Sequence, residues 1–186
     1  MICNLCPRSC NALRTETQGQ GFCGMPATPV AARAALHFWE EPPLSGTRGS
    51  GAIFFSGCPL RCVFCQNEAI SHNRFGTPLT AGQIRDLCLD LIAQGAHNIN
   101  LVSPTHYAHI LGEVLAEPLP VPVVWNTGGD EKTETLAALE GKVDVYLPDL
   151  KYLDGAVAAR YSAAPDYPQA ATAAIREMVR QTGPYV

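Results

Sequence analysis

The sequence is poor in charged residues and has no long apolar run, and these two lacks exclude several classes of protein. Asp, Glu, Lys and Arg make up 16% of the 186 residues, and the formal net charge is only -4. Such a charge gives no electrostatic footprint for nucleic acid or for an anionic membrane, so we expect neither as a partner. No stretch approaches the roughly 18 consecutive apolar residues of a transmembrane helix.

The N-terminus also lacks the basic and apolar regions of a signal peptide. What the chain does have is cysteine, with eight residues, of which seven fall in two tight clusters. Tight clusters without an export signal favour metal binding over disulfides, because disulfides persist in oxidising compartments. We therefore expect a cytoplasmic protein that binds metal.

The strongest motif is the loop Gly57 to Asn67, which follows the apolar run Gly51 to Phe55. Cys58, Cys62 and Cys65 in this loop have the spacing C-x3-C-x2-C. Three thiolates can hold three irons of a 4Fe-4S cube, which leaves the fourth iron open to a small molecule. The alternatives are zinc, which normally takes four ligands from two paired clips, and buried apolar thiols.

The first 26 residues form the second cluster, with C-x2-C-x3-C spacing and a more distant fourth cysteine, at Cys3, Cys6, Cys10 and Cys23. Few apolar side chains lie between these thiols, so we expect a metal to order them into a small knuckle. The spacing suits zinc and a second iron-sulfur cluster equally, and four free thiols are the remaining alternative.

The rest of the chain predicts an α/β fold. Strand-like apolar runs alternate with helix-like segments, the strands at 52–56, 98–102, 121–126 and 143–147 and the helices at 80–94, 107–116, 130–140 and 167–181. This alternation is typical of a parallel sheet with right-handed crossovers. We expect a knuckle at 1–26, a strand or hairpin and linker at 27–50, and a main domain at 51–186. Thr80 is the expected helix cap, and Cys88 is an expected buried thiol.

Parallel sheets place reactive groups at the carboxyl ends of their strands. The second predicted strand ends in a polar cluster at 103–107, and the third ends at Asn126 before two glycines. The fourth is followed by Asp149 and Lys151, which are placed to bind hydroxyls or a carboxylate. These strand ends are expected to converge on the cysteine loop.

Together these motifs resemble the radical S-adenosylmethionine (SAM) superfamily. They are similar to pyruvate formate-lyase activating enzyme and to its uncharacterised homologue group with an extra N-terminal four-cysteine motif. The resemblance implies that Cys58, Cys62 and Cys65 hold the 4Fe-4S cluster and are catalytic. It also implies that the adenosine and methionine parts of SAM are bordered by Phe64, Gln66, Asn67, Ser103, Thr105, His106, Asn126, Asp149 and Lys151. Ser103 to His106 stands where the activating enzymes have a Gly-Gly-Glu type motif.

The resemblance implies an oxidoreductase that passes one electron from the cluster to SAM and generates a 5′-deoxyadenosyl radical. A flavodoxin or ferredoxin would be the reductant, a glycyl radical enzyme the protein substrate, and anaerobic growth the setting. The alternatives are a small-molecule or peptide substrate and a non-catalytic iron-sulfur electron carrier. The implied fold is a partial (βα) barrel, truncated after about four βα units where relatives have six, so that the chain is expected to be a fragment.

Overall fold

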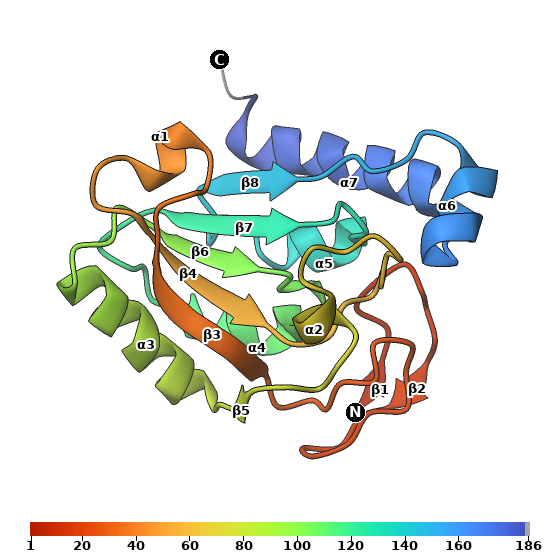
Figure 1. Cartoon of the computed structure of the whole chain (residues 1–186), viewed down its shortest axis with the longest axis horizontal. Coiled ribbons are helices and arrows are strands. Elements are labelled where there is room, and N and C mark those ends of the chain that lie inside the picture. The colour runs from red at the N-terminus through yellow and green to blue at the C-terminus, as the bar shows by residue number, and fades with distance from the viewer. Residues whose placement is uncertain (185–186) are drawn as a thin grey trace.

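A six-stranded mixed sheet organises the computed structural model, which describes residues 1–184 (Figure 1). The strand order is β5-β3-β4-β6-β7-β8. Four strands are parallel, namely β4 (Ser50–Phe55), β6 (Ile99–Val102), β7 (Val123–Thr127) and β8 (Val145–Pro148). At one edge, β3 (Val30–His37) and β5 (Thr77–Pro78) are antiparallel to their neighbours. The predicted α/β class and the four predicted strands are confirmed.

Helices alternate with the parallel strands, as the sequence pattern predicted, but the helix at Gly155–Ser162 was not predicted. They are α3 (Ala81–Ala93), α4 (Ala108–Val114) after the short 3-10 helix η1 (Thr105–Tyr107), α5 (Thr133–Ala137), α6 (Gly155–Ser162) and α7 (Tyr167–Thr182). Two further single-turn helices, α1 (Pro42–Ser45) and α2 (Glu68–Ser71), lie in the connections on either side of β4. In Figure 1, α3, α4 and α5 lie on one side of the sheet.

Helix α3 shows how the sequence determines an element. Thr80 accepts a hydrogen bond from the backbone of Gln83 (3.3 Å), and the Gln83 side chain accepts one from the backbone of Thr80 (2.9 Å). This capping box satisfies two amides that the first turn leaves free. Ile84, Cys88 and Leu91, spaced by four and three residues, form the buried stripe. The predictions for the Thr80 cap and for Cys88 are confirmed.

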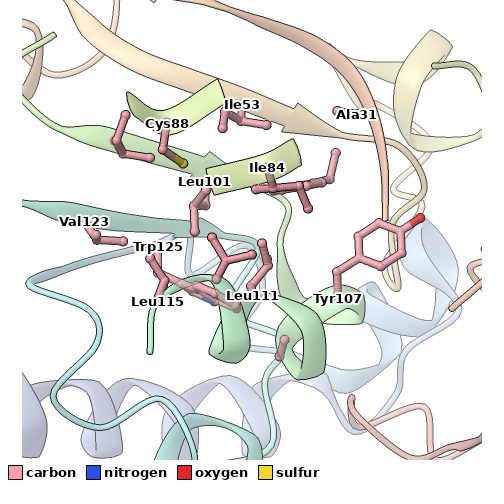
Figure 2. Close-up of a cluster of buried hydrophobic side chains, with 14 of the residues drawn as sticks. Ala31, Ile53, Ile84, Cys88, Leu101, Tyr107, Leu111, Leu115, Val123 and Trp125 are labelled. Carbon is pink, nitrogen blue, oxygen red and sulfur yellow. The ribbon is translucent and has the colours of Figure 1, made fainter. Parts of the chain in front are cut away.

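The main hydrophobic core lies between the sheet and the helices α3 and α4 (Figure 2). Ile53, Leu101 and Trp125 project from three adjacent strands and are fully buried against side chains such as Ile84 and Leu111. Burying an aliphatic side chain of this size contributes about 1.5–3 kcal/mol. Because side chains alternate along a strand, the residues between them face the opposite side.

That opposite side, called here the open face, carries residues that the helices do not cover. On β6 and β7 it presents Asn100, Val102 and Asn126, since Ile99, Leu101, Val123 and Trp125 belong to the helix-facing core. Asn100 pairs in register with Ala52 of β4, and Val102 with Phe54. The open face leads toward the carboxyl ends of the parallel strands, where the cysteine loop begins.

The N-terminal region is tied to this frame by a buried arginine. A two-stranded ribbon forms from β1 (Ile2–Cys3) and β2 (Ala12–Leu13). Arg14 follows it and is only 1% exposed, and its guanidinium donates to the carbonyl oxygens of Pro26 (3.2 Å) and His106 (2.6 Å). The segment predicted as a strand or hairpin and linker at 27–50 contributes β3 to the main sheet.

Among residues 1–184, none of the helices combines the length and apolar character needed to cross a bilayer.

Candidate functional site

A cavity of about 380 Å³ opens at the carboxyl ends of the parallel strands. Its volume is within the roughly 300–1,000 Å³ that small-molecule sites occupy. The cysteine loop forms one wall, and the residues after β6, β7 and β8 form the others. Its lining includes all three loop cysteines together with Phe64, Gln66, Asn67, Ser103, Asn126, Asp149 and Lys151. Ten of the twelve residues predicted for the site therefore surround one space.

The cysteine loop has a backbone that the sequence around it makes possible. Gly57, directly before Cys58, has a φ of 80°, and a Cβ there would lie 2.2 Å from Cγ of Met25. Glycine is needed at this position both for the positive φ and for the close approach. Leu60 is 1% exposed and packs beside Tyr167 in a second apolar cluster, which fixes the middle of the loop.

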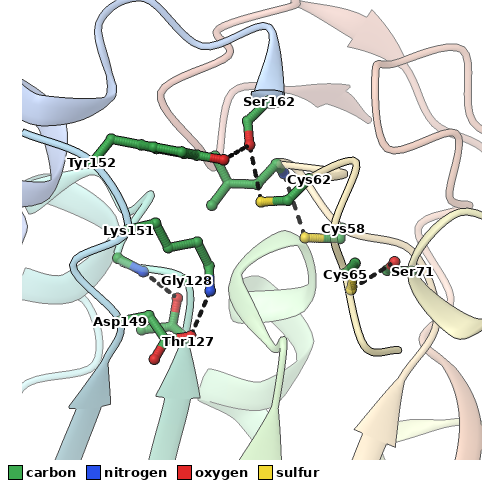
Figure 3. A network of polar contacts seen from close by, with 12 residues as sticks. Cys58, Cys62, Cys65, Ser71, Thr127, Gly128, Asp149, Lys151, Tyr152 and Ser162 are labelled. Carbon is green, nitrogen blue, oxygen red and sulfur yellow. Dashed lines mark hydrogen bonds and ion pairs between the residues drawn. The ribbon is translucent and has the colours of Figure 1, made fainter. Parts of the chain in front are cut away.

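Each loop thiol accepts a hydrogen bond from a neighbouring group (Figure 3). The Ser162 hydroxyl donates to Sγ of Cys62 (2.9 Å), and the Tyr152 hydroxyl lies 2.7 Å from Oγ of Ser162. Ser71 donates to Sγ of Cys65 (3.3 Å). Sγ of Cys58 accepts the backbone N–H of Leu60 (3.4 Å). Hydrogen bonds to sulfur stabilise thiolates and tune the potentials of iron-sulfur clusters.

Without a cation, burial favours the neutral thiol of Cys58. Burial raises the pKa of Cys58 to about 11, the thiols of Cys62 and Cys65 add to the rise, and backbone N–H groups oppose it. A bound metal would reverse this preference, since coordinated thiols are deprotonated. In the described part of the chain, no three His, Cys, Asp or Glu side chains are placed to hold one ion. Three thiols on one loop are the type of donor that iron-sulfur clusters take.

A charged pair lies across the cavity from the thiols. Nζ of Lys151 donates to Oδ2 of Asp149 (2.6 Å). The Tyr167 hydroxyl lies 2.8 Å from the carbonyl oxygen of Gly128 and 2.7 Å from that of Asp149, and it accepts the backbone N–H of Lys151 (2.8 Å). One tyrosine on α7 thus holds the ends of β7 and β8 together beside the cavity. Lys151 offers a cation to a carboxylate and Asp149 an acceptor to hydroxyls.

Two predicted site residues lie outside the cavity lining. Thr105 donates to the buried carboxylate of Glu131 (2.7 Å), which also accepts from Thr127 (2.6 Å) and Trp125 (3.0 Å). His106 is 1% exposed, its Nε2 lies 2.7 Å from the Ser56 carbonyl oxygen, and burial lowers its pKa to about 3. Both side chains belong to the buried framework beneath the cavity.

The four N-terminal cysteines lie in one region but are unequally exposed. Cys3 and Cys6 are buried, Cys23 is half-buried and Cys10 is exposed. Burial raises the pKa of Cys6 to about 12, and the neighbouring Asp130, Cys23 and Cys3 contribute to the rise. Burial likewise raises the pKa of Cys23, with contributions from Cys3 and Cys10. These thiols are near enough to influence one another.

Sequence reasoning missed three residues that support the cysteine loop. Ser162 and Tyr152 contact it from the segment after β8, and no local pattern marks either of them. Arg8, inside the N-terminal cysteine motif, donates to the carbonyl oxygens of Pro59 (2.7 Å) and Ser162 (2.5 Å). The position of Arg8 between two closely spaced cysteines was the only feature of the sequence that could have indicated its structural role.

An uncharacterised curated protein is similar to this chain. No protein-family model matches the chain. The chain is 33% identical over 174 residues to the uncharacterized protein MJ0674 of Methanocaldococcus jannaschii, a match that covers 89% of this chain and 50% of the relative. The chain therefore spans about half the length of the curated relative that it matches.

Proposed function

We propose that the chain is a radical SAM enzyme that holds a 4Fe-4S cluster and cleaves SAM reductively. The observation that carries this proposal is the single cavity that brings Cys58, Cys62 and Cys65 together with Asn126, Asp149 and Lys151. We further propose that the sheet is part of a radical SAM type (βα) barrel with the cavity at its mouth. An electron carrier would need no such cavity beside its thiols.

In this proposal the thiolates of Cys58, Cys62 and Cys65 hold the cluster, which supplies one-electron reduction of SAM when it is bound. Phe64 is 55% exposed at the cavity wall and offers a ring face to the adenine. Lys151 binds the methionine carboxylate through its ammonium group, and Asp149 accepts from hydroxyls or the amino group. Ser103 and Asn126 complete the polar lining between them.

The surroundings of the thiols support this role. Ser162 is 3% exposed and Tyr152 is 6% exposed, so the hydrogen bond from Ser162 to Cys62 and the contact between Tyr152 and Ser162 lie away from water. A donor in a water-poor environment interacts more strongly with a thiolate than one in solvent. By contrast, Val63 on the same loop is 67% exposed, which leaves one side of the loop open to a flavodoxin or ferredoxin.

The substrate class has two candidates, a glycyl radical enzyme and a small molecule or peptide. The N-terminal thiols, Cys3, Cys6, Cys10 and Cys23, are proposed to hold zinc or a second iron-sulfur cluster. Elemental analysis of Cys6→Ser and of the parent chain distinguishes zinc from an iron-sulfur cluster. Loss of zinc alone in the variant supports a zinc site, and loss of iron and sulfide together supports a second cluster. Unchanged metal content contradicts both.

The experiment that tests the proposal is electron paramagnetic resonance of the anaerobically reconstituted, reduced chain with and without SAM. We expect a cluster signal that changes when SAM is added and disappears in Cys62→Ala. Cys88→Ala is the matched control, because Cys88 is a fully buried thiol on α3 outside both clusters and should leave the signal intact. A cluster signal indifferent to SAM would favour the electron carrier.

A further inference from the structure

The connection between β3 and β4 crosses the open face at the amino ends of the parallel strands. It comprises residues 38–49 and contains α1. Asn98 donates to the carbonyl oxygen of Leu44 (2.8 Å), and Pro43 and Leu44 line a hollow of about 300 Å³ with Val124 and Val145. The connection therefore lies at the amino-terminal end of the open face, with α1 at the upper left of Figure 1, opposite the end that holds the cysteine loop.

One carboxylate of this connection is fixed on the open face by two amides. Oε2 of Glu40 accepts from Nδ2 of Asn100 (2.6 Å) and from Nδ2 of Asn126 (3.3 Å). Within residues 1–184 no lysine or arginine forms an ion pair with Glu40. Neutral donors orient the carboxylate but leave its charge uncompensated. Such a carboxylate remains available to a cation.

Asn100 adds a second acceptor beside this carboxylate. Its side chain is fully buried, and its Oδ1 has no hydrogen-bond partner in the part of the chain that the structure describes. Because Oδ1 and Nδ2 share one carbon, the bond from Nδ2 to Glu40 places Oδ1 next to the same carboxylate. An unpaired buried acceptor costs about 1–3 kcal/mol. A ligand that brings N–H donors to Glu40 could satisfy Oδ1 as well.

The charges around Glu40 favour a positively charged partner. Burial raises the pKa of Glu40, the adjacent Glu41 carboxylate adds to the rise, and the Asn100 bond and His37 oppose it. Arg33, in register with Phe54 on the open face, is exposed and forms no ion pair with Glu40. Two neighbouring carboxylates without a paired cation attract ammonium or guanidinium groups, and carboxylate binds guanidinium in a bidentate manner.

The carboxylate is connected to the main cavity through Asn126. This side chain lines the cavity that holds Cys58 and Lys151, and it also donates to Glu40. We propose that Glu40, oriented by Asn100 and Asn126, anchors the substrate through an ammonium or guanidinium group. The inference rests on the proposed function and names its substrate class: a cationic amine, or a peptide that presents a lysine or arginine side chain.

The test is nuclear magnetic resonance on the full chain, ¹⁵N-labelled, reconstituted and supplied with SAM. The probes are n-butylguanidinium and n-butylammonium, with 1-butanol as the neutral probe of similar size. We expect both cations to shift the side-chain amide signals of Asn100 and Asn126 in a saturable manner, and 1-butanol to leave them in place. Glu40→Gln should weaken binding of the cations by about 10- to 100-fold, the loss expected for hydrogen bonds to a charged group.

Glu134→Gln, which removes an exposed carboxylate from α5, is the charge-matched control and should bind the cations as the parent chain does. Glu40→Asp retains the charge and should still distinguish the cations from 1-butanol. The proposed role of Glu40 would be refuted if all three probes gave equal responses. It would also be refuted if Glu40→Gln bound the cations as tightly as the parent chain. The cation response decides this point whether or not SAM binds. If the electron paramagnetic resonance signal of the chain does not change with SAM, the proposed function fails, and that result is distinct from the response to the cations.

Discussion

Arg8 joins three parts of the chain through one side chain. Its guanidinium donates to the carbonyl oxygens of Pro59 (2.7 Å), Leu60 (3.4 Å) and Ser162 (2.5 Å), and to that of Ala163. It also lies over a ring of the N-terminal region, with Cζ 3.9 Å from the ring centroid of Phe22. Replacing Arg8 with alanine removes all of these hydrogen bonds and the contact with the Phe22 ring. The carbonyl oxygens at the end of α6 then lose the cation that donates to them.

The magnitude follows from these contacts. A hydrogen bond from a charged donor contributes about 1.5–3 kcal/mol, but water can replace the donor at the more exposed carbonyls and such contributions do not add fully. Stacking on an aromatic ring adds about 0.5–1 kcal/mol at a partly exposed site. We therefore expect Arg8→Ala to lower the free energy of unfolding by about 3 kcal/mol. For a chain of this length the corresponding fall in Tm is about 6–12 °C.

The assay is urea unfolding of the full chain, with Arg176→Ala as the control. Arg176 is exposed on α7, and its loss should change the free energy of unfolding by no more than about 0.5 kcal/mol. Arg8→Lys keeps the charge without the planar fork, so it should recover only part of the loss. If Arg8→Ala unfolds at the same urea concentration as the parent, the bridging role of Arg8 is refuted.

The remaining predictions concern the site and the framework beneath it. Ser162→Ala removes the donor to Cys62, so redox titration of the reconstituted chain should show a lower cluster potential; an unchanged potential would mean that this bond does not tune it. Burial raises the pKa of Glu131 to about 7, so between about pH 4.5 and 7 the folded state binds a proton that the unfolded state has lost, and the free energy of unfolding falls as pH rises through this window. Denaturation of Glu131→Gln at several pH values should show a weaker dependence of this free energy on pH, whereas the control Glu134→Gln should keep the dependence of the parent chain. Lys151→Ala should weaken SAM binding in equilibrium dialysis by about tenfold or more, and unaltered binding would remove Lys151 from the site.

The sequence allowed much of the site to be predicted because parallel strands end at the same edge of a sheet. Asn126 and Asp149 each lie at or just after an apolar run, and Cys58 follows another at a distance of three residues. Once the runs are assigned to neighbouring strands, their ends must be close together. The α3 boundaries were equally accessible, since Thr80 and Gln83 form a local capping pair.

Other residues could not be placed from local pattern. Ser103 has a φ of 55°, and this left-handed turn leads into η1, where Thr105 and His106 point into the framework and not into the cavity. Nothing in the residue types around Ser103 specifies that turn. Ser162 contacts Cys62 across 100 residues of sequence, and Glu40 reaches Asn126 across 86. Such contacts depend on the completed fold.

The separation between Cys62 and Ser162 also has a consequence for the order of events during synthesis. The loop thiols leave the ribosome 100 residues ahead of the serine that later donates to one of them. At about 5–20 residues per second, that interval lasts on the order of 5–20 s. During this time the thiols exist without the segment that will shield them. The thiols of a nascent chain are therefore open to oxidation before α6 is made, and an oxidising environment in those seconds would reach them more easily than in the folded chain.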